Sequence, residues 1–359
     1  MIAEMLPAHL FRPDLFSDPA PVRSAASDDE RDQIATILSE GYEHVGAPFA
    51  VERCGALHIN SNNYVVRTTR GETLLVKRLG GSPPPELETQ LRLAAWLAGE
   101  GLPLPALQRT ATGALIHANP ARGENYCVLA FVPGRHFSGA HAELAPMGKL
   151  IADMTLALER APAVLRPSSP VPLVGNAQCE IWRELESRAL DEVLGPERGA
   201  ELAAHRAVVA EALEEAYLAS QLEAPSDLAH IDLHPHNLLV DRNGPEAVLD
   251  FPSLRRASAP VFIAFGALKL LRQAGTQLPP ECRRRSELLR LRDLFLEPCL
   301  VRLGARVAPS HLGQRARIEI VRRIFILIEL SLRNGDRRWN HVLPVHLAAL
   351  EESRILFEA

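Results

Sequence analysis

Three side chains in one short stretch of the sequence have the types and the spacing that phosphoryl transfer needs. Asn237 is five positions after Asp232, and Asp250 is thirteen positions after Asn237. In such an arrangement one carboxylate orients a hydroxyl group or accepts its proton, while an amide oxygen and a second carboxylate bind Mg²⁺ on the phosphates of a nucleotide. We therefore predict that Asp232 is the catalytic group and that Asn237 and Asp250 are metal ligands.

Histidines in the same stretch allow a second interpretation. His230 is assigned to the catalytic site, where we expect it to brace the loop through hydrogen bonds rather than to react. His230, His234 and His236 also alternate as the ligands of a zinc ion could in a strand, so a zinc hydrolase is the rival enzyme class. Pro235 interrupts this alternation, and a zinc site leaves Asp250 without a role. We therefore favour magnesium over zinc.

The elements that hold these side chains begin with a hairpin. A short apolar strand over residues 238–240, a turn at Asn243 and Gly244, and a second strand that ends at Asp250 set the separation of the metal ligands. Upstream, runs of alternating or β-branched residues predict five antiparallel strands, over residues 49–57, 64–68, 73–79, 107–116 and 126–132. The second and third of these are expected to pair as a hairpin, which places Lys77 near the end of a strand.

Two helices are predicted beside the sheet, and most of the remaining sequence has helical periodicity. The first helix is capped near Ser27, and the second opens at Pro83–Pro85 and ends at Gly99–Gly101. Pro133 and Gly134 mark the best domain boundary. Beyond that boundary the apolar residues recur at helical spacing, and the basic residues 315–323 are expected on the solvated face of a helix.

The stretch HIDLHPHNLLVD, followed by VLDF, resembles the aminoglycoside phosphotransferase and choline kinase superfamily, including its homoserine-kinase-like members. This resemblance implies an α+β, bilobal, protein-kinase-like fold: an N-lobe of antiparallel sheet plus one helix and a mainly helical C-lobe. We divide the chain into an N-terminal arm and helix (1–45), a nucleotide-binding N-lobe (46–131) and a C-lobe (132–359) that carries the catalytic loop, the metal site and the substrate-binding helices.

The resemblance also assigns residues that bind ATP. Lys77 corresponds to the family's phosphate-binding lysine, and it is one of only three lysines in the chain. The strand YCVLAFVPG is similar to the hinge that binds an adenine, with Leu129 and Phe131 as its contacts. The other two lysines, Lys149 and Lys269, are expected to lie outside the site.

Departures from the family pattern concern the partner of that lysine and the metal loop. The family's glutamate partner falls at Gln90, so either Gln90 hydrogen-bonds Lys77 or Glu88 reaches it through a shifted register. Pro252 follows Asp250 and Phe251 in place of the usual glycine, which stiffens the loop. A nucleotide-binding pseudokinase with a regulatory role is therefore a hypothesis from another class.

Composition excludes several other functions. The 44 acidic and 39 basic residues give a net charge of −5, so no basic excess favours nucleic acid as a partner. The five cysteines form no C-x-x-C pair, which fits a reducing cytoplasm, and we expect neither an export signal nor a membrane partner. The prediction is an ATP-dependent, Mg²⁺-assisted kinase acting on a hydroxyl group of a small metabolite or an aminoglycoside-like antibiotic.

Overall fold

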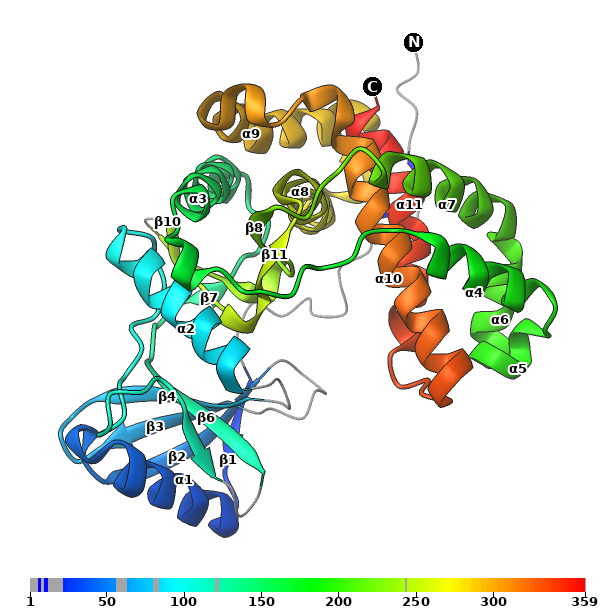
Figure 1. Cartoon of the computed structure of the whole chain (residues 1–359). Helices are drawn as coiled ribbons and strands as arrows, with labels where there is room; N and C mark the ends of the chain where they lie inside the picture. The colour runs from blue at the N-terminus through cyan, green and yellow to red at the C-terminus, as the bar shows by residue number, and fades with distance from the viewer. Residues whose placement is uncertain are drawn as a thin grey trace.

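An antiparallel sheet forms the N-terminal lobe of the computed structural model (Figure 1). The structure describes residues 6–7, 10–11, 22–55, 63–79, 84–119, 123–242 and 244–358. Ala56, Leu57, Pro83 and Asn243, which belong to elements predicted above, lie outside these residues. In spatial order the strands of the sheet are β1 (Val22–Ala25), β2 (Pro48–Gly55), β3 (Asn63–Thr68), β4 (Thr73–Leu79), β6 (Glu124–Ala130) and β5 (His117–Asn119).

The predicted hairpin is confirmed, and its register decides which face carries Lys77. β3 pairs with β4 so that Asn63 lies opposite Lys77 and Tyr64 opposite Val76. Val76 belongs to the buried cluster that packs against helix α1 (Asp28–Gly41). Successive side chains of a strand point to opposite faces, so Lys77 lies on the face of the sheet away from α1. The predicted cap of α1 is also confirmed, because Ser27 forms a capping box with Glu30.

The strand predicted over residues 107–116 is wrong. Leu107 alone forms an isolated bridge, to Leu129, and the strand at this edge of the sheet is β5. A turn interrupts the predicted run, since the amide of Gly113 donates to the carbonyl of Thr110 at 2.8 Å and Gly113 has a φ of 83°. A glycine with positive φ closes such a turn without strain, which ends the extended conformation there.

The N-terminal arm contributes to both lobes. Residues 22–25 form the edge strand β1, which pairs with β2. Leu10 and Phe11 are buried in the core of the C-terminal lobe, and the amide of Phe11 donates to Oε1 of Glu352 at 2.9 Å. The two described parts of the arm therefore lie in different lobes.

The C-terminal lobe is mainly helical (Figure 1). Its helices are α3 (His141–Glu159), α4 (Asn176–Glu186), α5 (Leu190–Leu194), α6 (Pro196–Ala204), α7 (Arg206–Ser220), α8 (Ala259–Thr276), α9 (Arg285–Leu303), α10 (Leu312–Asn334) and α11 (Leu343–Phe357). One small sheet contains β7 (Arg135–His136), β9 (Leu238–Asp241) and β10 (Gly244–Val248). A second small sheet pairs β8 (Asp227–His230) with β11 (Leu254–Ala257). The predicted α+β fold is confirmed.

Two helices matter for the position of the site. α2 (Pro84–Gly99) contacts both the segment after Asp250 and α3, so it connects the N-terminal sheet to the helical lobe. α8 is buried along almost its whole length and packs against α9 and α10. Among the residues that the structure describes, no helix combines the length and the apolar character needed to cross a bilayer.

The contact between α3 and α9 gives a test of the packing. A Cβ on Gly148 of α3 would lie 2.0 Å from the carbonyl oxygen of Phe295 in α9. We expect Gly148→Ala to lower the free energy of unfolding by about 1–3 kcal/mol, because overpacking forces backbone shifts. Urea denaturation measures this change.

Gly99 is the matched control at the exposed end of α2, where a Cβ would meet no atom within 4 Å. Gly99→Ala should leave the protein unchanged or stabilise it by up to about 1 kcal/mol. Equal effects of the two substitutions would contradict the packing described for α3 and α9.

Candidate active site

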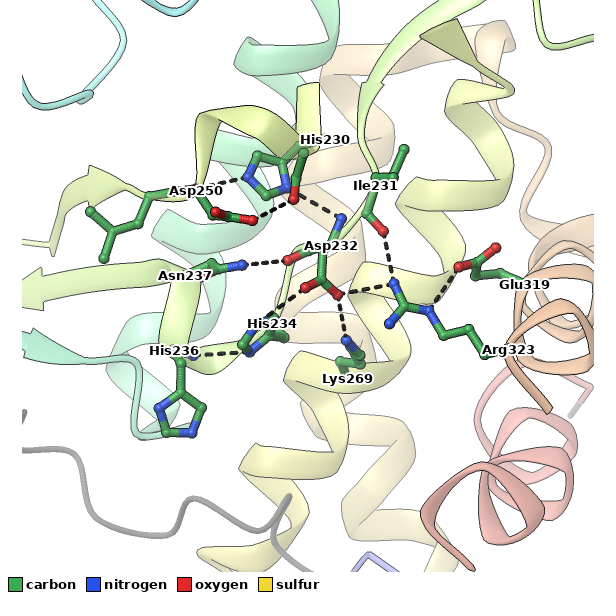
Figure 2. A network of polar contacts seen from close by, with 12 residues as sticks. His230, Ile231, Asp232, His234, His236, Asn237, Asp250, Lys269, Glu319 and Arg323 are labelled. Atoms are coloured by element: carbon green, nitrogen blue, oxygen red, sulfur yellow. Dashed lines mark hydrogen bonds and ion pairs between the residues drawn. The ribbon is translucent and has the colours of Figure 1, made fainter. Parts of the chain in front are cut away.

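The loop between β8 and β9, which the sequence predicts to be catalytic, is braced by His230 (Figure 2). Nε2 of His230 lies 2.8 Å from the carbonyl oxygen of Leu249, so Nε2 carries the hydrogen and donates it. Nδ1 then accepts from the backbone amide of Asp232 at 3.4 Å. Burial of this ring, which is 3% exposed, lowers its pKa. His230 is thus a neutral link between the loop and the end of the next strand, as the sequence predicted.

Cations from two helices keep the carboxylate of Asp232 ionised. Its Oδ1 accepts from Nζ of Lys269 at 3.0 Å and from Nη2 of Arg323 at 2.9 Å, while Oδ2 lies 3.5 Å from Nε2 of His234. Burial alone would raise the pKa of this carboxyl. Lys269, with His234 and Arg323, outweighs burial and holds the pKa well below its usual range.

Lys269 and Arg323 were not predicted as site residues. Lys269 was expected outside the site, and Arg323 belongs to the basic residues expected on a solvated helix face; both expectations are wrong. Arg323 also donates to the carbonyl of Ile231 and pairs with Glu319, whose side chain is fully buried. A lysine within the apolar run of α8 was a usable signal, because an unpaired charge there would be costly. No sequence signal distinguished Arg323 from its neighbours.

The hairpin of β9 and β10 brings the predicted metal ligands together. The amide of Leu249 donates to the carbonyl of Asn237 at 2.8 Å, which places Asp250 next to Asn237. Nδ2 of Asn237 donates to the carbonyl oxygen of Asp232 at 2.9 Å. This bond fixes the amide group and leaves its Oδ1 as an acceptor (Figure 2). The sequence spacing thus produces the predicted juxtaposition.

Asp250 joins the two lobes through Lys77. Nζ of Lys77 donates to Oδ1 of Asp250 at 2.6 Å, and the hydroxyl of Ser253 donates to Oδ2 at 2.5 Å. Burial would raise the pKa of Asp250, but Lys77 and Ser253 outweigh it and the pKa lies below its ordinary value. Asp250 has a φ of 63°, a left-handed conformation that aspartate tolerates better than most residues.

Neither expected partner of Lys77 contacts it. Gln90 is buried and donates from Nε2 to the carbonyl of Pro252 at 2.9 Å, so it fastens α2 to the segment after Asp250. Glu88 makes no hydrogen bond or ion pair with Lys77 within the described part of the chain. The expectation that one of them partners Lys77 is corrected: the lysine reaches Asp250 instead, because the amide of Gln90 is neutral and is already used by Pro252.

The predicted hinge lies beside the strand of Lys77. Leu129 pairs with Leu75 of β4, and the amide of Phe131 donates to the carbonyl of Thr73 at 3.1 Å. The guanidinium of Arg23 lies over the ring of Phe131, 5.0 Å from its centroid. The segment that connects the lobes is therefore tied to the sheet on which Lys77 stands.

The three histidines do not form the alternative zinc site. Both ring nitrogens of His230 already have partners, on Leu249 and Asp232. The ring of His236 lies 5.0 Å from that of His136, and the ring of His234 turns towards Asp232 (Figure 2). Over the described residues, no three His, Cys, Asp or Glu side chains are grouped so that they could hold a metal ion.

Comparisons with known proteins identify the family of the chain. Residues 54–257 match the sequence profile of the family described as "Phosphotransferase enzyme family". A homoserine kinase from Acidiphilium cryptum (strain JF-5) is 34% identical over 131 residues, which are 36% of this chain and 39% of that protein. The chain thus matches well under half of the length of this relative.

Solved structures with the same fold cover nearly the whole chain. A spectinomycin phosphotransferase in complex with ADP and spectinomycin superimposes with a TM-score of 0.65 at 14% identity, over 90% of this chain and 97% of that one. A choline kinase from Streptococcus pneumoniae gives 0.55 at 14% identity, over 91% and 99%. At these identities the likeness shows the fold, and it confirms the predicted protein-kinase-like architecture.

The cations on Asp232 predict a change in acid stability. In the unfolded chain the pKa of an aspartate is about 3.9. Because the folded pKa of Asp232 is lower, its carboxylate stabilises the protein above the unfolded pKa, and this contribution is lost as the pH falls through the folded pKa. Lys269→Met should bring the two pKa values closer, so the stability should fall less steeply between pH 4 and pH 2 than in the wild type.

Urea denaturation at a series of pH values measures that slope. Lys149→Met is the control, because this lysine contacts neither Asp232 nor Asp250 within the described residues. A slope in Lys269→Met equal to the wild-type slope would contradict the role given to Lys269.

Proposed function

Because the chain belongs to the phosphotransferase enzyme family, we propose that it transfers the γ-phosphoryl group of ATP to a hydroxyl group of a small molecule. The observation that carries the proposal is the placement of two carboxylates and an amide on the braced loop and hairpin between β8 and Asp250: Asp232 facing two cations, Asn237 bonded to its backbone, and Asp250 held by Lys77. Each of these groups has one part in phosphoryl transfer.

Asp232 orients the acceptor. Its Oδ1 accepts from Lys269 and Arg323 at 2.9–3.0 Å, whereas Oδ2 has the longer contact, 3.5 Å, with Nε2 of His234, so Oδ2 is the oxygen that receives the hydroxyl group. A carboxylate whose pKa lies well below its usual range is a weak base. Asp232 therefore serves mainly to align the hydroxyl group. In a loose transition state for phosphoryl transfer, alignment of the attacking oxygen matters more than early removal of its proton. His230 keeps the loop in place and does not react.

The donor set fits a magnesium ion. Oδ1 of Asn237 and the carboxylate of Asp250 are hard oxygen ligands, the type that Mg²⁺ takes together with phosphate oxygens and waters. Bound there with the nucleotide, the ion would neutralise charge that develops on the phosphates. Lys77 and Asp250 bond to each other in this structure, so Lys77 is in position to move onto a phosphate when Asp250 accepts a metal.

Further residues of the N-terminal lobe complete the proposed nucleotide site. Gln90 holds the carbonyl of Pro252 and so fixes the loop after Asp250 against α2. We assign Leu129 and Phe131 to the contact with the adenine, since they border the strand of Lys77. Glu88 lies on the same helix as Gln90 and has no assigned contact with the nucleotide.

A pseudokinase is the second candidate, and a specific contact favours it. Among the described residues of α2 no carboxylate pairs with Lys77, which bonds instead to Asp250, the proposed metal ligand, and blocks it until the bond is exchanged. A regulatory protein would bind ATP without transferring its phosphoryl group. Turnover of ATP in the presence of an acceptor alcohol distinguishes the two.

Substitution of Asp232 tests the chemistry. Asp232→Asn should keep the nucleotide Kd within a few-fold and lower the rate of transfer by about 10²–10⁴, the usual contribution of a positioned acid–base group. A coupled assay for ADP, run with amino alcohols, hydroxy amino acids, sugars and aminoglycosides, measures the rate. Wild-type turnover in the variant would reject the assignment of Asp232.

Metal binding tests Asp250 separately. Mg²⁺ should bind together with the nucleotide, and Asp250→Ala should abolish this coupling because it removes a carboxylate ligand. Calorimetric titration of a non-hydrolysable ATP analogue, with and without Mg²⁺, measures the coupling. His236→Ala is the control and should retain it; loss of coupling in His236→Ala but not in Asp250→Ala would place the metal on the histidines.

A further inference from the structure

Two cations, Lys269 and Arg323, bond to the same oxygen of Asp232. Within the described part of the chain, the ion pairs of this cluster join Lys269 and Arg323 to Asp232, and Arg322 and Arg323 to Glu319. Its side chains are at most 31% exposed, and Glu319 is fully buried. Guanidinium and ammonium groups at such a partly desolvated position form strong charge-assisted hydrogen bonds with an anionic ligand.

Arg323 has a donor group left for that anion. Its Nε donates to Glu319, and its Nη2 donates to Ile231 and Asp232. Nη1 has no hydrogen-bond partner among the described residues, and Figure 2 shows it on the side of the guanidinium near Lys269. The side chain is 22% exposed. Glu319 and the ring of Phe265, 4.8 Å away, fix the guanidinium in this orientation.

The positive charges of Lys269 and Arg323 beside Asp232 do not suit a cationic acceptor. A molecule whose hydroxyl group meets Oδ2 of Asp232 must lie near Lys269 and Arg323, because both cations bond to the other oxygen of the same carboxylate. A second cation there would be repelled, whereas a carboxylate or phosphate would gain charge-assisted hydrogen bonds from the guanidinium.

We propose that the acceptor of the phosphoryl group carries an anionic group, a carboxylate or a phosphate, and that Arg323 binds it through Nη1 while Asp232 receives the hydroxyl. Arg323 is then the residue that determines acceptor specificity. This inference rests on the proposed function and narrows its substrate class to hydroxy acids, hydroxy amino acids or phosphorylated alcohols.

Matched acceptors that differ only in the anionic group provide the test. The pairs are homoserine with 3-aminopropan-1-ol, serine with ethanolamine, and threonine with 1-aminopropan-2-ol for a carboxylate, and glycerol 3-phosphate with glycerol for a phosphate. The wild type should prefer the anionic member of at least one pair by tenfold or more in kcat/KM. The pair that shows the preference identifies the anion.

Variants connect the preference to Arg323. Arg323→Gln should reduce it by about 10- to 100-fold, the loss expected of a charge-assisted hydrogen bond, through a higher KM for the anionic member. Arg323→Lys should restore part of it. Arg315→Gln is the control, since Arg315 lies on the same helix and pairs with Glu223 but not with Asp232; it should keep the full preference.

Two outcomes would overturn the inference. One is a preference for the amino alcohols that Arg323→Gln leaves unchanged. The other is an equal fall of kcat for both members of a pair, which would place Arg323 on the transferred phosphoryl group. A thermal-shift assay with the same compounds measures binding without turnover. If no acceptor is phosphorylated, the proposed function fails. The anion site is still supported if the anionic compounds raise the Tm of the wild type but not that of Arg323→Gln.

Discussion

The site is organised around the carboxylate of Asp232, which two cations hold ionised at a mostly buried position. Lys269 comes from α8, Arg323 from α10, and the backbone of the loop is fixed by His230. Removing both cations would leave the carboxylate without compensation, and removing the carboxylate would leave two adjacent cations. The catalytic loop and the two central helices of the C-terminal lobe are therefore stabilised together, and the loop cannot move far without breaking this cluster.

A second carboxylate provides the part of the site that can change. Asp250 is bound from the N-terminal lobe by Lys77 and from its own loop by Ser253. Both contacts use oxygens that a metal ion would also use, so binding of a metal–nucleotide complex must replace at least the bond to Lys77. Gln90 and Pro252 keep α2 attached to the same loop through a neutral hydrogen bond that this exchange does not disturb. Asp232 is thus fixed by the helices, while the proposed function requires Asp250 to exchange Lys77 for a metal ion.

Sequence reasoning succeeded where the site is local. Asn237 and Asp250 flank the hairpin of β9 and β10, Asp232 lies in the loop just before it, and the hairpin of β3 and β4 fixes the face that carries Lys77. It failed where contacts depend on how distant elements pack. Lys269 and Arg323 reach Asp232 across 37 and 91 residues, and no periodicity reveals which face of a helix meets a given loop. The strand predicted over residues 107–116 failed for a local reason, the turn closed by Gly113, which outweighs the β-branched residues around it.

The central claim is that the two carboxylates have different partners during the reaction, and a crystal structure with Mg²⁺ and a non-hydrolysable ATP analogue tests it most directly. The account predicts Mg²⁺ bound to Asn237 and Asp250, with Lys77 moved from Asp250 to a phosphate. Asp232 should still bond to Lys269 and Arg323. A metal ion bound to His234 and His236, or a nucleotide bound while Lys77 and Asp250 remain joined without a metal, would contradict it.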